Sequence, residues 1–354
     1  MELEALGWNA SWLRKAADYM NSDLIPFRVL AEHKERYEVL GLGGESMAEV
    51  SGRFRFNSER REDFPAVGDW VMANPVEPDY ALIQAVLPRQ TKLARKDKLK
   101  QTEEQILAAN VDTVFVVTSA NEEFNLRRIE RFLVIVRESG ALPVVVLNKS
   151  DIAVNLPETM VRARSTGHEV VSVSAVRGNG LDALQPWMQT GNTIALIGSS
   201  GVGKSTIINS LLETDAQRIQ SIRSIGDKGR HTTTHRELFI LTNGALLIDT
   251  PGIREIQLYG EEDSVEDAFA DIAALGADCR FRDCSHDAEP GCAVIAALES
   301  GQLDPKRYGN YLKMKKELLY LKRKQDPAAA RAEKERWKKI HQNQRAGYKA
   351  RKKT

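Results

Sequence analysis

Two nucleotide-binding motifs occur in this chain in the reverse of their usual order, and this order constrains the fold more than any other feature. NKSD (residues 148–151) comes about fifty residues before GSSGVGKS (residues 198–205). The second motif commonly holds nucleotide phosphates, and the first commonly reads a guanine base. In an ordinary guanine-nucleotide switch the phosphate loop precedes the base reader. Either one match is accidental, or the order of a common fold has been rearranged.

The phosphate motif fits the G-x-x-x-x-G-K-[ST] pattern in the right context, because TIALI before it reads as a strand and TIINSLL after it as a helix. Glycines let backbone N–H groups turn toward phosphates, Lys204 supplies a point charge, and the Ser205 hydroxyl can ligate Mg²⁺. A glycine-rich turn without function is the alternative. The predicted phosphate-side residues are Gly198, Ser199, Ser200, Gly201, Val202, Gly203, Lys204, Ser205 and Thr206.

The NKSD motif predicts which base is bound. The Asp151 carboxylate can accept hydrogen bonds from N1–H and the 2-amino group of guanine, whereas adenine has no donor there, and such sites discriminate by about 10⁴-fold or more. Lys149 would lie along the base, and Asn148 would tie this loop to the phosphate loop. A surface turn is the alternative. After another strand, Ser174 and Ala175 fit the short loop that meets guanine O6.

Two further elements belong to the phosphate side. In LLIDTPG (246–252), Asp249 would hold the Mg²⁺ shell and Gly252 would donate its N–H to the γ-phosphate. In HTTTH (231–235), Thr233 is the favoured ligand for Mg²⁺ and the γ-phosphate, with Thr232 and Thr234 also possible by position. The five elements together form a standard set in circularly permuted order, so the first match is not accidental.

The residue that orients the attacking water is less evident. Many GTPases have glutamine directly after the DxxG glycine, but this chain has Ile253 there. His231 is the best nearby candidate, because its loop would bring it close to the γ-phosphate. A solvent-exposed loop histidine is the alternative.

The rest of the chain predicts a multidomain protein. Short β runs between 27 and 90 indicate a barrel of the OB-fold type, with another small barrel or sandwich as the alternative. Apolar strands alternating with amphipathic helices then indicate an α/β domain with a buried parallel sheet. The expected division is an N-terminal extension (1–25), an OB-fold barrel that binds RNA (26–95), a circularly permuted P-loop GTPase domain (96–260), a mainly helical zinc-binding domain (261–325) and a basic tail (326–354).

The only three cysteines of the chain lie close together and predict a metal site. Cys279, Cys284, His286 and Cys292 follow the spacing C-x₄-C-x-H-x₅-C. Four soft or borderline ligands in one short stretch suit a closed, structural Zn²⁺ site. A chance cluster of buried cysteines and a redox switch are the alternatives.

Charge is distributed unevenly along the chain. Residues 306–354 contain eighteen Lys and Arg against four Asp and Glu, whereas the whole chain carries a net charge of +1. The basic arm, with interleaved tyrosines and a tryptophan, favours RNA binding over a merely solvated helical face. No apolar run is long enough to span a membrane, and the N-terminus lacks the features of a signal peptide. We therefore expect a cytoplasmic protein with no membrane contact.

Taken together, these residues resemble the ribosome small-subunit-dependent GTPase A family (RsgA, also YjeQ or EngC), which are circularly permuted bacterial GTPases. The resemblance covers nearly the whole chain and rests on PAVGDWV, NKSD, SA, GSSGVGKS, GRHTTTH, DTPG and the cysteine segment. It implies an OB-fold, a permuted G domain and a zinc domain. It also implies late maturation of the small ribosomal subunit, with contact to its 16S rRNA and subunit-stimulated hydrolysis of GTP to GDP near the decoding region. His231 matches a histidine that is proposed to assist hydrolysis in this family.

Two other functions are compatible with parts of the sequence. One is an RNA-binding assembly module in which nucleotide occupancy gates binding and hydrolysis is secondary. The other is a P-loop metabolic kinase, which NKSD and the lack of an evident small-substrate site disfavour. We expect a monomer, although no sequence motif fixes the oligomeric state.

Overall fold

The computed structural model describes two compact parts of the chain, residues 1–257 and residues 258–354. The described residues are 2–19, 22–34, 36–96, 104–219, 236–249, 262–282, 284–286 and 289–325. His231, Thr233 and Gly252 lie outside them, as do Thr232, Thr234, Ile253 and the basic tail. No helix in the described ranges has the length and apolar character needed to cross a membrane.

The first part contains a closed five-stranded barrel. Its strands are β1 (Ile25–Glu32), β2 (Tyr37–Gly41), β3 (Gly44–Val50), β4 (Trp70–Glu77) and β5 (Tyr80–Val86). They pair in the order β1-β2-β3-β5-β4, and β4 closes onto β1; only the β3–β5 pair is parallel. Alternate residues such as Val29, Val39, Val71 and Ile83 fill the interior. This topology confirms the predicted OB-fold.

A short helix in the barrel differs from the sequence-based expectation. AEVSGRFRF (48–56) reads as one strand, but the strand ends at Val50 and α2 (Gly52–Asn57) follows. The Ser51 hydroxyl accepts a hydrogen bond from the Phe54 N–H at 3.2 Å, which caps the first turn of the helix. Phe54 then packs against the barrel core. The cap and this contact outweigh the strand-like alternation of Arg and Phe.

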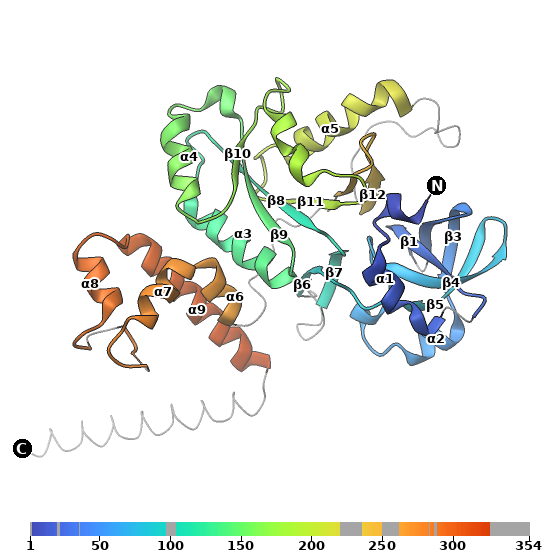
Figure 1. Ribbon diagram of the computed structural model, residues 1–354, viewed down its shortest axis with the longest axis horizontal. Helices are drawn as coiled ribbons and strands as arrows, with labels where there is room; N and C mark the ends of the chain where they lie inside the picture. The colour runs from blue at the N-terminus through green and yellow to red at the C-terminus, as the bar shows by residue number, and fades with distance from the viewer. Residues whose placement is uncertain are drawn as a thin grey trace, which may run out of the picture. The chain divides into compact units, whose positions relative to one another are not determined.

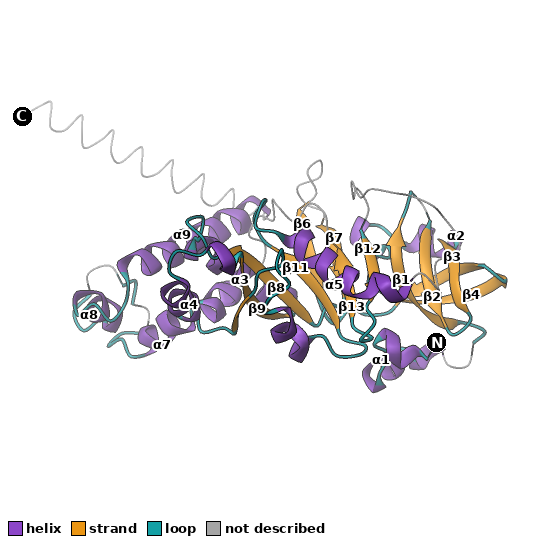
Figure 2. Cartoon of the chain, turned by 90° about the horizontal axis from the view of Figure 1, so that it is seen from above, coloured by secondary structure: helices purple, strands orange, loops and turns teal. Residues whose placement is uncertain are grey.

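A six-stranded sheet follows the barrel. Its order is β10-β9-β8-β11-β13-β12, and all neighbours are parallel except β12. The strands are β8 (Thr113–Ser119), β9 (Leu142–Asn148), β10 (Val170–Ser172), β11 (Thr193–Ile197), β12 (Glu237–Ile240) and β13 (Leu246–Asp249). Helices α3 (Leu126–Ser139), α4 (Leu156–Arg164) and α5 (Lys204–Ile219) lie beside it (Figures 1 and 2). Every residue of β8 is buried, as expected for a strand covered on both faces.

The barrel and this sheet are joined edge to edge. Strand β12 pairs antiparallel with β1 at Ala31 and Glu237, so one sheet runs through both. A ribbon of β6 (Lys92–Lys96) and β7 (Glu104–Ala109) lies between the two in sequence. The buried Arg28 of β1 donates to the Asn110 carbonyl and to the Thr193 hydroxyl, both at 3.1 Å. The contact with Thr193 links the barrel to the start of β11, and the contact with Asn110 links it to the segment between β7 and β8.

The N-terminal segment packs on the same junction. It contains α1 (Ala10–Lys15), whose first turn is capped by the Asn9 side chain. Trp8 contacts the buried Trp70 of the barrel edge-on, with ring centroids 4.7 Å apart. Gly7 lies so close to the Gly191 carbonyl that an added Cβ would stand 2.6 Å from that oxygen. The segment is therefore an integral part of the first unit.

The second unit is helical, as predicted. Its helices are α6 (Glu262–Ala268), α7 (Ala270–Ala277), α8 (Ala293–Glu299) and α9 (Pro305–Gln325). Its small core includes Phe269, whose ring lies 5.6 Å from that of Tyr311. Arg307 on α9 pairs with Asp271 at 2.7 Å. Helices α6, α7 and α8 are short. A small unit of this kind buries little apolar surface, so a further link between α7 and α8 would stabilise it.

Candidate functional site

The nucleotide motifs meet at one edge of the parallel sheet. The phosphate loop follows β11, NKSD follows β9, Ser174 and Ala175 follow β10, and Asp249 ends β13. Since these strands run in the same direction, their carboxyl ends lie at the same edge, where open α/β sheets bind ligands. The motifs follow one another along the chain in an unusual order. They nevertheless lie at the same edge of the sheet, where they can form a single site.

The phosphate loop requires glycine at several positions. Gly198 and Gly203 have positive φ angles of 149° and 91°. An added Cβ at Gly198 would lie 2.1 Å from the Val117 carbonyl oxygen, and one at Gly203 would lie 2.3 Å from the Asn148 amide nitrogen. The loop therefore packs directly on the neighbouring strands, and side chains at these two positions would displace it.

Lys204 begins helix α5, so the phosphate loop leads into a helix N-terminus. The Lys204 ammonium donates to the carbonyls of Gly198 and Ser199 at 2.8 and 2.7 Å, which folds its side chain over the loop. Ser205 and Thr206 lie in the first turn of α5, where unpaired backbone N–H groups favour anions. This arrangement provides donors and a cation for a phosphate chain.

Asn148 links the two halves of the site. Its side chain is 3% exposed. The amide nitrogen donates to the Val202 carbonyl at 2.9 Å, and the amide oxygen accepts from the Ala175 N–H at 3.1 Å. One side chain thus fixes the phosphate loop and the loop after β10 to the end of β9.

Asp151 is held in an orientation suited to base recognition. One carboxylate oxygen accepts from the Ser174 hydroxyl at 2.7 Å, and the other lies 3.5 Å from Arg177 Nε. The Ser174 hydrogen bond, supported by Arg177, holds the pKa of Asp151 below its usual range. The group is therefore a carboxylate at neutral pH and can accept from the N–H donors of guanine.

Two basic residues border the base side. Lys149 has a left-handed backbone with φ 61°, and its ammonium lies 3.6 Å from a Glu123 carboxylate oxygen. Sequence reasoning missed Arg177, because no motif extends from Ser174 and Ala175 to that position. Its contact with Asp151 arises only from the turn that returns residue 179 to Ser174.

Of the predicted residues beyond the phosphate loop on the phosphate side, the described part of the chain includes Asp249. Asp249 is half-buried at the end of β13 and pairs in register with Glu237 of β12. Its position beside β11 brings it to the same edge as Ser205. The roles of His231, Thr233 and Gly252 stay predictions, since those residues lie outside the described ranges.

A separate cluster of candidate metal ligands lies in the second unit. The candidate ligand atoms of Cys279, Cys284, His286 and Cys292 all lie within 4.8 Å of one another. His286 Nδ1 is 3.5 Å from the sulfur of Cys279 and 3.4 Å from that of Cys292, and these two sulfurs are 3.8 Å apart. A tetrahedron with metal–sulfur bonds of about 2.3 Å has edges of about 3.8 Å. The four side chains therefore fit a metal ion, which would tie the end of α7 to the start of α8.

A parallel sheet with a phosphate loop after one strand, and a guanine reader on an earlier strand, defines a circularly permuted P-loop GTPase. Comparison with known proteins agrees: the RsgA GTPase family model matches residues 86–259. The chain belongs to the RsgA GTPase family, and it is a GTP hydrolase.

Relatives and solved structures extend this match over most of the chain. A small ribosomal subunit biogenesis GTPase RsgA of Opitutus terrae is 48% identical over 98% of both chains, and that of Syntrophotalea carbinolica is 42% identical over 96% of both. The crystal structure of YjeQ from Thermotoga maritima is 29% identical with a TM-score of 0.64, covering 84% of this chain and 99% of that one. YloQ, a circularly permuted GTPase, is 26% identical with a TM-score of 0.62, covering 83% and 94%.

Proposed function

We propose that this GTPase binds the small ribosomal subunit during its late maturation, that the subunit stimulates GTP hydrolysis, and that hydrolysis drives release. The relatives that match almost the full length are named small ribosomal subunit biogenesis GTPases. Within the chain, the observation that carries the GTP-dependent part is the pair of Asn148 hydrogen bonds, which joins the phosphate loop to the base loop. Because Asn148 joins the two loops, binding of the guanine base and binding of the phosphates are coupled.

The nucleotide residues take the following roles in this proposal. Asp151 accepts from the guanine N–H groups, Ala175 donates its N–H toward O6, and Lys149 lies along the base. The phosphate loop holds the β- and γ-phosphates, and Gly252 donates to the γ-phosphate. Ser205 and Thr233 would ligate Mg²⁺, with Asp249 holding its hydration shell; Mg²⁺ supplies charge neutralisation for phosphoryl transfer when bound.

His231 is the proposed catalytic residue. Ile253 occupies the position where many GTPases have a glutamine, and a hydrocarbon side chain cannot orient water. With no glutamine in place, intrinsic turnover is expected to be slow, about 10⁻⁴ to 10⁻² s⁻¹. Contact with the subunit would bring His231 toward the attacking water, which accounts for stimulation.

The other parts of the chain supply binding and stability. Zn²⁺ is the proposed ion at Cys279, Cys284, His286 and Cys292, because three thiolates and one imidazole with no open position suit a structural zinc. The barrel and the basic tail would contact 16S rRNA. We also propose the five-part division given by the sequence, a monomeric state and a cytoplasmic location.

In a second candidate function the chain also binds the small ribosomal subunit, but GTP hydrolysis is not needed for its release. The Ser174 hydroxyl orients the Asp151 carboxylate within the chain itself, so nucleotide occupancy alone would set the binding state of the chain. A His231→Ala variant separates the two functions. If hydrolysis drives release, the variant stays on small subunits after GTP is added. If it releases normally while hydrolysis is lost, occupancy is the switch.

Co-sedimentation tests the proposal itself. The full chain is mixed with purified small or large ribosomal subunits in the presence of a non-hydrolysable GTP analogue or GDP, and its fraction in the pellet is measured. The expected result is pelleting with small subunits that is much stronger with the analogue than with GDP. Equal pelleting with large subunits, or none with either, contradicts the proposed partner.

A further inference from the structure

The joint between the barrel and the sheet contains a partly buried ion pair. Arg236 directly precedes β12, and one of its guanidinium nitrogens lies 3.6 Å from the carboxylate of Glu32, the last residue of β1. The same nitrogen donates a hydrogen bond to the Ile106 carbonyl of β7 at 3.1 Å. The Arg236 and Glu32 side chains are 14% and 25% exposed. Arg236 therefore connects the barrel, the β6–β7 ribbon and the start of β12.

Glu32 is shared by two arginines. Its second carboxylate oxygen accepts a hydrogen bond from Arg61 of the barrel at 3.2 Å. Burial lowers the pKa of Arg236, the charges of Arg95 and Arg61 lower it further, and the Glu32 carboxylate opposes this lowering. Without Glu32, these positive charges would act on a partly buried guanidinium with no carboxylate to offset them. Removing one partner of a shielded pair costs more than the pair itself contributes to stability.

The joint lies in line with the end of β13. Ala31 of β1 pairs with Glu237 of β12, and Glu237 pairs with Asp249, which ends β13. The three residues form a row across three strands, and this row spans about 10 Å because neighbouring strands lie about 4.8 Å apart. Glu32 and Arg236 are the sequence neighbours of the first two residues of the row. The ion pair therefore joins β1 to β12 beside the row that ends at Asp249, the residue proposed to hold the Mg²⁺ shell.

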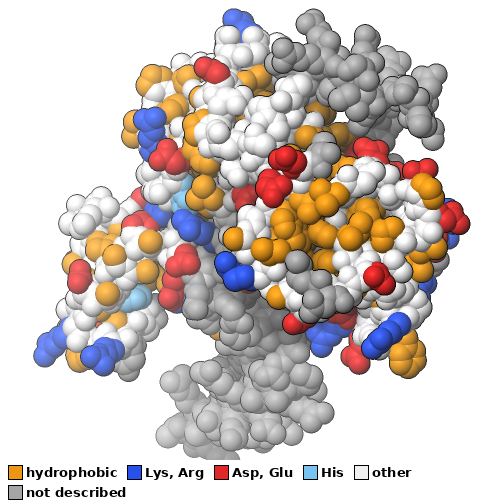
Figure 3. Space-filling model, turned by 45° about the vertical axis from the view of Figure 1, so that its right-hand side comes forward, with side chains coloured by type: hydrophobic (Ala, Val, Ile, Leu, Met, Phe, Trp, Pro, Cys, Tyr) orange, Lys and Arg blue, Asp and Glu red, His pale blue; other side chains and the backbone are white. Residues whose placement is uncertain are grey.

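The Glu32–Arg236 pair differs from the charge pairs of the surface. Charged side chains of both signs lie on the face shown in Figure 3, and exposed pairs contribute little to stability. Arg36 and Glu49 are such a pair, 2.9 Å apart with exposed fractions of 64% and 35%. By contrast, Glu32 and Arg236 bridge two strands whose backbones pair only at residues 31 and 237 in the described part of the chain. Their side chains therefore carry a substantial part of this connection.

We propose that Glu32 and Arg236 are positioning residues for Asp249, through which the barrel helps to set the affinity of the nucleotide site for Mg²⁺. The inference rests on the proposed function, because it takes Asp249 to hold the hydration shell of the ion. With the ion pair in place, β12 is fixed on its outer side by β1 and keeps the end of β13 in register. When the pair is broken, β12 and the Asp249 carboxylate can shift relative to Ser205, whose hydroxyl is a proposed ligand.

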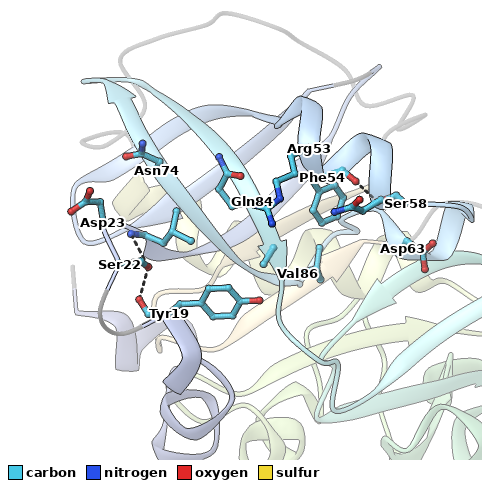
Figure 4. Close-up of a pocket in the computed structure, with 13 residues that line it drawn as sticks. Tyr19, Ser22, Asp23, Arg53, Phe54, Ser58, Asp63, Asn74, Gln84 and Val86 are labelled. Carbon is cyan, nitrogen blue, oxygen red and sulfur yellow. Dashed lines mark hydrogen bonds between the residues drawn. The ribbon is translucent and has the colours of Figure 1, made fainter.

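The first test measures nucleotide binding by the full chain, with a fluorescent non-hydrolysable GTP analogue titrated at several Mg²⁺ concentrations and in EDTA. Glu32→Gln and Arg236→Gln are each expected to raise the Mg²⁺ concentration for half-maximal binding about three-fold or more, with binding in EDTA unchanged. Because the two residues act as a pair, the double variant should resemble each single variant. Arg36→Gln and Arg53→Gln are controls and should give wild-type values; Arg53 lines a pocket of the barrel to which neither Glu32 nor Arg236 belongs (Figure 4).

The second test follows hydrogen–deuterium exchange of the same variants without nucleotide. Faster exchange in β12 and β13 but not in β9, together with the higher Mg²⁺ requirement, supports the inference. Unchanged exchange in β13 or an unchanged Mg²⁺ requirement overturns it. An equal loss of affinity with and without Mg²⁺ also overturns it, because the pair would then only stabilise the unit as a whole.

Asp249→Asn separates failure of this inference from failure of the proposed function. This variant is expected to raise the Mg²⁺ requirement at least as much as Glu32→Gln does. If Asp249→Asn leaves the requirement unchanged, the proposed role of Asp249 fails, and the exchange of β13 still decides whether the ion pair positions that strand. If Asp249→Asn raises the requirement and Glu32→Gln does not, the inference alone is overturned.

Discussion

At the scale of single residues, the base side of the site depends on two polar side chains with different tasks. Asn148 is buried and uses both ends of its amide to hold two loops. Asp151 accepts a hydrogen bond from the Ser174 hydroxyl and is the proposed acceptor for the N–H groups of guanine. In the proposed function Asn148 determines the shape of the site and Asp151 its selectivity for guanine, so their substitutions should have different effects.

Asp151→Asn is expected to change the base preference of the site from guanine to xanthine. The amide can donate to the 2-oxo group of xanthine, whereas the two hydrogen bonds from guanine to a carboxylate are lost. Affinity for GTP should fall by about 10²-fold or more, and affinity for XTP should rise. Competition binding with both nucleotides measures this, and Asp182→Asn is an exposed control. Unchanged preference for GTP would show that Asp151 does not read the base.

Ser174→Ala is expected to weaken guanine nucleotide binding about five-fold, since a hydrogen bond to a charged group is lost. The pKa of Asp151 should rise toward its ordinary value, because Ser174 is the main cause of its lowering. The carboxylate remains ionised at neutral pH, so the loss should be the same between pH 6 and 8. If affinity is lost only as the pH falls within this range, protonation of the Asp151 carboxylate causes the loss, and misorientation of that carboxylate does not. Ser165→Ala serves as the control.

At the scale of elements, the phosphate loop is shaped by its contacts with two strands. Gly198 lies against the end of β8 and Gly203 against the side chain that ends β9. The loop conformation is thus determined by packing as well as by glycine content. A sequence pattern shows the glycines but not which neighbour each of them must avoid.

Gly203→Ala is expected to reduce GTP affinity by more than about ten-fold. The added Cβ would meet the Asn148 amide nitrogen at 2.3 Å in a backbone conformation with φ 91°, which costs about 1–3 kcal/mol for a residue other than glycine. Equilibrium binding of a fluorescent GDP analogue measures the effect. Gly43→Ala, where nothing lies within 4 Å of the added Cβ, should bind as the wild type does. Equal affinity of the two variants would contradict this account.

Sequence patterns predicted elements well where local signals agreed and poorly where they competed. The strands that carry NKSD and the phosphate motif were predicted because apolar runs end directly at the motifs. The pattern of residues 48–56 predicts one strand, but the strand ends at Val50 and the Ser51 hydroxyl caps a helix over Gly52–Asn57. A capping hydrogen bond can thus select a helix over a strand although the hydrophobic pattern of the sequence stays the same.

At the scale of the whole molecule, the first unit is one continuous framework. The β1–β12 pairing and the buried Arg28 join the barrel to the sheet that carries the nucleotide site. Burial lowers the pKa of Arg28 to about 10, so it stays charged at neutral pH. This joint was not predictable, because it pairs residue 31 with residue 237 and periodicity says nothing about partners so distant in sequence. Arg177 was missed for a similar reason.

The second unit is expected to depend on its metal. Its core is small, and the four ligands lie in the region between α7 and α8, so chelation or Cys284→Ser should lower its unfolding temperature. Binding of GDP in the first unit should be unchanged. Circular dichroism melts with and without added Zn²⁺, alongside GDP titrations, measure the two effects. Recovery of the melt on adding Zn²⁺ back is the control, and an unaltered melt after complete metal removal would contradict a structural role.

The central claim is that the small ribosomal subunit completes the catalytic site of this GTPase. The most direct measurement is steady-state GTP hydrolysis by the full chain alone, with purified small subunits and with purified large subunits. The account predicts slow hydrolysis alone, strong stimulation by small subunits and no stimulation by large ones. Hydrolysis that is equally fast under all three conditions would contradict it and would leave a GTPase whose site is complete within its own chain.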